Sequence, residues 1–145
     1  LGDFLPDMAG APVFRMARSA ARMAALTSVQ SALTRVSPGL FMRLLMRGTD
    51  PADSALMQTH GEVLCRALSE GLRNGRTAYL REITAYVHPW ARHLEHVQCP
   101  VTLFHGTEDR WTPPAMARAL VDGLPRARLH WQTGLGHYTT LAAVL

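Results

Sequence analysis

The sequence contains no lysine and few aromatic residues, and these shortages argue against a nucleic-acid-binding protein. All 15 basic residues are arginine, and aromatic residues make up only 7% of the chain. The arginines are scattered, whereas nucleic-acid-binding domains cluster basic residues and interleave them with aromatics. A solvated arginine-rich surface is the simpler explanation of the net charge of +4. We therefore expect no nucleic-acid partner.

Cysteine and long apolar runs are also scarce. Cys65 and Cys99 lie far apart without metal-binding spacing, so we expect two reduced thiols and a cytoplasmic location. No apolar run reaches the roughly 18–20 residues of a bilayer span, and we expect no stable membrane insertion. His93 and His96 have the spacing of neighbours on a helix, but no cluster of further ligands completes a metal site. We expect neither a metal nor an organic cofactor.

The length and the start of the chain bear on its completeness. With 145 residues, of which 48% are hydrophobic, the chain is long enough for one domain or for part of a larger one. It begins Leu1-Gly2-Asp3, with neither a methionine nor a signal peptide. We interpret this start as a cut end of a longer polypeptide.

Residues 1 to 89 have the apolar spacing of successive helices. Asp50-Pro51 is a strong helix start, with Asp as N-cap and Pro at the first helical position. Gly61 is expected to break that helix, and Asn74-Gly75 to end the next one. The predicted helices are Val13–Val36, Leu40–Met46, Pro51–Thr59, Glu62–Arg73 and Thr77–Val87.

Residues 90 to 145 follow a different pattern. Val101–His105 and Ala127–Gln132 are predicted strands, and Thr112-Pro113 is predicted to cap a helix between them that ends near Leu124. A last short helix is predicted over Tyr138–Leu145. Strand, helix and strand in this order form the βαβ unit of a parallel sheet. Two strands are marginal as a sheet, so we expect an α/β fold whose other strands are missing beside Val101–His105.

Two short loops follow the predicted strands and carry the residues of chemical interest. Asp109 follows the first strand and His137 the second. Ligands and catalytic groups gather beyond the carboxyl ends of parallel strands. A carboxylate there can hold the Nδ1–H of an imidazole and leave Nε2 free to take a proton. Alternatively, Asp109 is a turn or cap residue near Thr112, and His137 is a loop histidine bonded to backbone.

The stretch from Leu94 to His137 resembles the end of an α/β-hydrolase. The resemblance rests on these pieces in order: Val97-Gln98-Cys99-Pro100-Val101, His105-Gly106-Thr107-Glu108-Asp109, Thr112-Pro113, Leu124-Pro125-Arg126-Ala127-Arg128-Leu129 and Gly134-Leu135-Gly136-His137. It implies that Asp109 is the acid and His137 the base of a catalytic triad. The neighbouring Glu108 is the other candidate for the acid, but the spacing from Gly106 and to Pro113 favours Asp109.

The resemblance further implies that residues 1–89 are a helical cap over the active site and residues 90–145 the C-terminal part of the hydrolase core. The cap is rich in methionine, a flexible side chain suited to an apolar pocket. We expect Met16, Met23, Met42 and Met46 to contact an apolar ester substrate. Core packing between cap helices is the alternative for each of them.

The family's nucleophile lies in a Gly-x-Ser-x-Gly segment, and no such string occurs in this chain. The resemblance therefore implies a C-terminal portion of an esterase-like or lipase-like enzyme, with the missing N-terminal half of the core as its partner. We expect this portion to be inactive alone. The nucleophile is a serine by default, with Asp or Cys as alternatives. Two other functions stay open: a non-enzymatic helical interaction module, and an arginine-mediated binder of anionic surfaces or nucleic acid.

Overall fold

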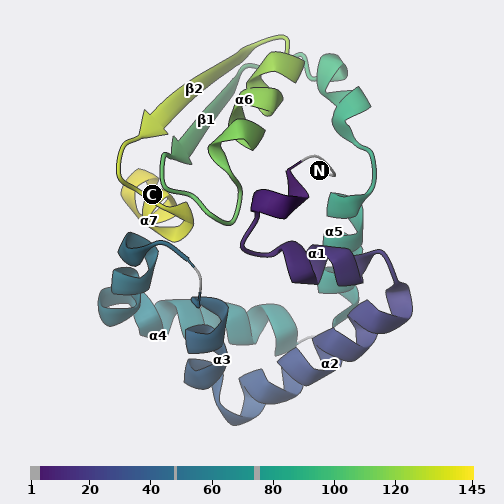
Figure 1. Cartoon of the computed structure of the whole chain (residues 1–145), viewed down its shortest axis with the longest axis vertical. Helices are drawn as coiled ribbons and strands as arrows, with labels where there is room; N and C mark the ends of the chain where they lie inside the picture. The colour runs from purple at the N-terminus through teal and green to yellow at the C-terminus, as the bar shows by residue number, and fades with distance from the viewer. Residues whose placement is uncertain (1–3, 48, 74–75) are drawn as a thin grey trace.

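The computed structural model describes residues 4–47, 49–73 and 76–145, and it shows a mostly helical chain with a small parallel sheet (Figure 1). Leu1–Asp3 and the predicted stop at Asn74-Gly75 lie outside these residues. The elements before the sheet are η1 (Leu5–Asp7), α1 (Ala11–Ala17), α2 (Ala20–Val36), α3 (Pro38–Leu45), α4 (Pro51–Arg73), α5 (Arg76–Val87) and η2 (Ala91–His96). The sheet region consists of β1 (Val101–Gly106), α6 (Pro114–Gly123), β2 (Ala127–Gln132) and α7 (His137–Val144).

The two predicted strands are confirmed and pair in parallel. Val101 lies opposite Ala127 at one end, and Gly106 lies opposite Gln132 at the other. Because the strands are in step, the loops that follow them leave the sheet at the same edge. Among the described residues, β1 is paired with β2 alone, which gives a two-stranded sheet. The mixed α/β character expected from the sequence is therefore present.

Two predicted helix boundaries are wrong. The helix predicted over Val13–Val36 is divided between α1 and α2, because Ser19 starts a new helix and its hydroxyl accepts the Arg22 amide at 3.5 Å. Gly61 does not break α4, which continues from Pro51 to Arg73. A glycine inside a helix costs only about 1 kcal/mol relative to alanine, and tertiary packing outweighs that cost here.

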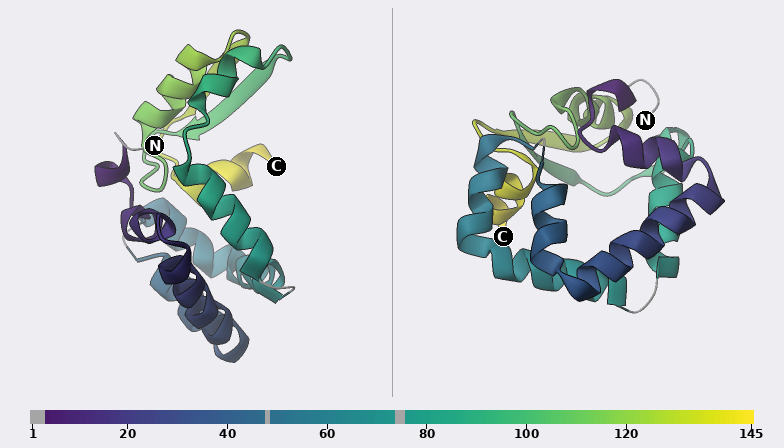
Figure 2. Two further views of the ribbon diagram at one scale, coloured as in Figure 1. Left: turned by 90° about the vertical axis from the view of Figure 1, so that its right-hand side faces the viewer. Right: turned by 60° about the horizontal axis from the view of Figure 1, so that its bottom comes forward.

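The helices α2, α3 and α4 lie at one end of the molecule and the sheet region lies at the other (Figure 1 and Figure 2). α7 lies between them, beside the start of α4 (Figure 1). The helical part is packed around buried apolar side chains that include Met23, Met42 and Met46. In the part of the chain that the structure describes, every helix is too short or too polar to cross a bilayer.

Candidate active site

The carboxylate of Asp109 and the imidazole of His137 meet at the carboxyl edge of the sheet. His137 Nδ1 lies 2.9 Å from Asp109 Oδ2, although the two residues are 28 positions apart in the sequence. Asp109 lies in the loop after β1, and His137 is the first residue of α7, after β2. The side chain of Asp109 is 4% exposed and that of His137 is 43% exposed. The structure therefore brings together the two residues singled out in the sequence, with the acid inside and the histidine facing outward.

Asp109 is held by several donors from its own loop. Its Oδ1 accepts the amides of Trp111 and Thr112, each at 2.8 Å. Its Oδ2 accepts the Thr112 hydroxyl at 2.7 Å in addition to His137. Asp109 is thus both a turn residue, through the two amides at Oδ1, and the partner of His137, through Oδ2. Four donors fix the orientation of this carboxylate.

Thr112 does not cap α6, contrary to expectation. The N-cap of α6 is Pro113, and the Thr112 hydroxyl turns back to Asp109. His105 supports the same loop, because its Nε2 donates to the Thr112 carbonyl at 2.9 Å. The sequence gives no sign of either role, since both depend on how the loop folds back over the end of β1.

The loop that carries His137 approaches the end of β1 closely. Gly134 adopts a φ of 75°, which favours glycine, and its amide donates to the Thr107 hydroxyl at 2.9 Å. A Cβ at Gly106 would overlap the Leu135 carbonyl oxygen and lie 2.6 Å from the Thr140 hydroxyl. The absence of a side chain at Gly106 therefore lets the two loops come into contact.

Sequence reasoning missed a third carboxylate, that of Asp53 on α4. Asp53 is 0% exposed, and it accepts the His137 amide at 2.9 Å and the Thr139 amide at 2.8 Å. The interpretation of Asp50 as a helix cap is confirmed, because its Oδ1 accepts the Asp53 amide at 2.9 Å. The Asp-Pro-x-Asp pattern marks the helix start, but it does not indicate a bond to a residue 84 positions away.

The pKa values of the pair move apart. Burial alone would lower the pKa of His137, but the hydrogen bond to Asp109 and the negative charges of Asp109 and Asp53 outweigh it and raise the pKa above 6.5. Burial alone would raise the pKa of Asp109, but hydrogen bonds from His137 and Thr112 and the charge of His137 lower it below 3.8. The pair is therefore an ion pair over a wide range of pH.

This ion pair predicts a pH dependence of stability. The pKa of His137 is higher in the folded state, so its contribution is complete below pH 6.5 and is lost as the pH rises through the folded pKa. The pKa of Asp109 is lower in the folded state, so its contribution is lost as the pH falls below 3.8 through the folded pKa. We expect the difference in unfolding free energy between the wild type and His137→Gln to be largest between these limits, as measured by urea unfolding.

The difference between the wild type and His137→Gln is the informative quantity, because it isolates the contribution of His137. The His137 side chain is 43% exposed, so solvent screens its attraction to Asp109. We therefore expect the change in unfolding free energy to be modest. In an Asp109→Asn background, the pH dependence attributable to His137 should become smaller. An unchanged difference in that background would contradict the ion pair.

One cavity is lined by His137, and a larger one lies beyond Tyr138. The first, of about 250 Å³, lies beside β1 and α7 and is lined by Phe104, Asp109 and His137, among others. The larger one, of about 540 Å³, is lined by apolar side chains of α3, α4 and α5, together with Trp111 and Tyr138. The Tyr138 ring touches the His137 ring edge to face, with 5.2 Å between their centroids. The Tyr138 side chain thus lies between the larger cavity and His137. The volume of this cavity suits a small organic molecule.

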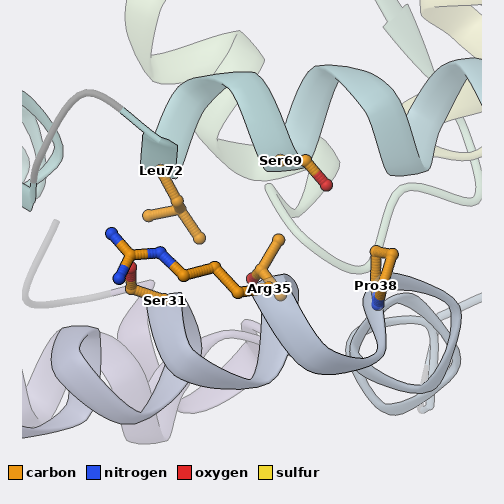
Figure 3. Close-up of a pocket in the computed structure, with 6 residues that line it drawn as sticks. Ser31, Arg35, Pro38, Ser69 and Leu72 are labelled. Carbon is orange, nitrogen blue, oxygen red and sulfur yellow. The ribbon is translucent and has the colours of Figure 1, made fainter.

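A further cavity of about 320 Å³ lies between α2 and α4, away from His137 (Figure 3). Arg35 extends along it toward Leu72, whereas the Ser69 hydroxyl points in another direction, toward Pro38 (Figure 3). These side chains do not converge on one point, so the cavity offers no assembled polar site.

The methionines expected to contact substrate lie elsewhere. Met23, Met42 and Met46 are 1%, 3% and 6% exposed, and Met16 is partly buried. None of the four lines any of the cavities described above. Their contact with substrate stays a prediction, and the observed packing agrees with the alternative of core residues. The apolar side chains that do line the larger cavity include Phe41, Leu45 and Leu68.

Within residues 4–47, 49–73 and 76–145, no group of three or more His, Cys, Asp or Glu side chains is placed to hold a metal ion. No protein-family model, no curated protein and no solved structure matches this chain.

Proposed function

We propose that this chain is the acid- and base-bearing part of a serine-type α/β-hydrolase that acts on esters. The observation that carries the proposal is the bond of 2.9 Å between His137 Nδ1 and Asp109 Oδ2, at the carboxyl ends of two parallel strands. In an acid–base pair of this kind, the carboxylate selects the imidazole tautomer and stabilises the imidazolium. With Nδ1 bonded to Asp109, Nε2 is the nitrogen that exchanges a proton.

The chemistry follows from that assignment. A serine hydroxyl from another stretch of polypeptide attacks the ester carbonyl while His137 Nε2 takes its proton. The alcohol leaves with that proton, and the acyl group stays on the serine. A water molecule, deprotonated by His137, then attacks the acyl-enzyme and releases the carboxylic acid and the serine. Asp109 keeps its negative charge throughout and balances the imidazolium.

The larger cavity supports an apolar substrate. Its volume of about 540 Å³ is bounded by Phe41, Leu45, Leu68 and Leu72, next to Tyr138. Burial raises the pKa of Tyr79, which also lines this cavity, so its phenol stays neutral there at physiological pH. Gln30 and the exposed Glu82 also line the cavity, but most of its lining is apolar. A mostly apolar cavity near a proton-accepting histidine favours the acyl or alkyl group of an ester.

The exposed edge and face of β1 support an N-terminal half as the partner. Phe104 projects from the middle of β1 and is 46% exposed, and its ring stacks on His130 of β2. A partly exposed aromatic face on a short sheet is a usual place for another element to pack. Further strands beside β1 would cover Phe104 and bring a nucleophile to the carboxyl edge where His137 lies.

The experiment compares this chain alone with the chain joined to a preceding segment that carries Gly-x-Ser-x-Gly. We expect no hydrolysis of a chromogenic butyrate ester above background by the chain alone, because the attacking oxygen and the oxyanion donors are missing. We expect turnover when the segment is supplied, covalently or as a second chain. Turnover by the chain alone that His137→Ala abolishes would overturn the incomplete site.

A further inference from the structure

We infer that Asp53, on the cap helix α4, is the positioning residue of His137. The inference rests on the proposed role of His137 as the base, and it adds a regulation of that site: the histidine is oriented only while α4 is docked against α7. Each step follows from the contacts at the start of α7.

The start of α7 lacks a side-chain cap of its own. Its N-cap is Gly136, which has no side chain to accept the first free amides. A Cβ at Gly136 would overlap the carboxylate of Asp50, so a capping side chain has no room at this position. The amides of His137 and Thr139 therefore find their partner outside the helix.

Asp53 supplies these partners from 84 to 86 residues away. Its Oδ2 accepts the His137 amide at 2.9 Å, and its Oδ1 accepts the Thr139 amide at 2.8 Å and the Thr139 hydroxyl at 3.0 Å. The Thr139 hydroxyl in turn accepts the Gly136 amide at 2.7 Å. Asp53 thus fixes the backbone of His137 directly and that of Gly136 through Thr139.

The position of the His137 backbone decides where its ring lies. The ring meets Asp109 at 2.9 Å and Tyr138 at a centroid distance of 5.2 Å, and a rotation of the first turn of α7 would change both contacts. The charged and titratable groups near the ring are Asp109 in the loop after β1, Asp53 on α4 and Tyr138 on α7, together with His105 on β1, whose Nε2 lies 3.8 Å from Asp109 Oδ2. Asp53 is fully buried, so its charge is screened less than that of a surface carboxylate.

Because Asp53 belongs to the helical part, separation of α4 from α7 would free two amides and the Thr139 hydroxyl at the start of α7 and remove one negative charge near the ring. Without the Asp53 carboxylate these groups have no fixed acceptor, so the first turn of α7 would no longer be held in place. The histidine would then lose the orientation that Asp109 requires. The contact between α4 and α7 and the pairing of His137 with Asp109 should therefore form and break together.

The test uses this chain labelled with ¹⁵N-histidine, and NMR reads the imidazole of His137 directly. The His137 signals are those that disappear in His137→Gln. We expect Asp53→Asn to lower the pKa of His137, to weaken the downfield Nδ1 proton resonance, and to speed amide exchange at His137 and Thr139 by about tenfold. Glu62→Gln is the matched control: it removes an exposed carboxylate from the same helix and should change none of these.

An unchanged pKa and Nδ1 resonance in Asp53→Asn, with faster exchange of the two amides, would overturn the inference, because Asp53 would then be only a helix cap. If Asp53→Asn does not fold, Thr139→Ser and Thr139→Val carry the test. Serine keeps the hydroxyl and should preserve the resonance, whereas valine should weaken it; equal behaviour of the two would count against the inference. Asp109→Asn separates the two proposals: if it leaves His137 unchanged the proposed function fails, and if only Asp53→Asn has no effect this inference alone fails.

Discussion

Replacing His137 by alanine is expected to lower kcat by about 10⁴-fold or more in the enzyme assembled from this chain and a segment carrying the nucleophile. The imidazole accepts the proton of the attacking hydroxyl and later returns it to the leaving alcohol, so both halves of the reaction lose their proton carrier. The measurement is kcat on a chromogenic butyrate ester. KM should change little, because the cavity proposed to hold the substrate is lined by other residues.

Asp109→Asn should lower kcat by about the same factor. An asparagine in the same place can present its NH₂ group to Nδ1, which favours the wrong tautomer and removes the charge that stabilises the imidazolium. Glu108→Gln is the control for this change, since Glu108 is the exposed carboxylate next to Asp109. It should retain activity close to that of the wild type.

The double variant discriminates between an acid–base pair and two independent residues. If Asp109 acts through His137, His137→Ala with Asp109→Asn should be no slower than His137→Ala alone. Losses that multiply would argue against the pair. Wild-type kcat in either single variant would show that this pair does not carry the reaction, whereas absence of hydrolysis in every assembled form would favour the non-enzymatic helical module.

Gly106→Ala is expected to destabilise the fold by about 2–3 kcal/mol. The added Cβ would overlap the Leu135 carbonyl oxygen and crowd Gly136 and Thr140, and backbone atoms cannot move aside as a flexible side chain does. The closing of the loops over the end of β1 would be prevented. Urea unfolding of the isolated chain measures the effect.

Gly39→Ala is the matched control, because it makes the same chemical change on α3 where a Cβ would meet no heavy atom within 4 Å. Alanine has less freedom than glycine in the unfolded chain, so this variant should be stabilised by about 0.5–1 kcal/mol. Equal effects of the two substitutions on the unfolding free energy would show that the close approach at Gly106 is unimportant.

The sequence predicted those parts of the fold that depend on neighbouring residues. The strand β1 follows from a run of β-branched and apolar residues, and β2 follows from the alternation of Leu129 and Trp131 with polar residues. The start of α4 follows from Asp50-Pro51. The meeting of Asp109 and His137 was predictable because parallel strands in step deliver their following loops to one edge. Each of these predictions needed only a local pattern and one rule of sheet geometry.

The rest depended on packing between distant segments. The helix α4 continues through Gly61 because tertiary contacts outweigh the weak helix propensity of glycine. Asp53 carries the mark of a helix start, but its partners lie on α7, and no local pattern indicates them. The methionines show the same limit: their helical spacing predicts an inward face without distinguishing the interior of the bundle from the wall of a cavity.

The register of the two strands has a consequence for insertions and deletions. Gly106 lies opposite Gln132, and the loops with Asp109 and His137 leave from this level. One extra residue in either strand would advance its loop by about 3.3 Å and turn every following side chain to the opposite face. That displacement exceeds the 2.9 Å between His137 Nδ1 and Asp109 Oδ2. Natural length variation should therefore avoid both strands and fall at the opposite end of the sheet, in the turn that joins α6 to β2.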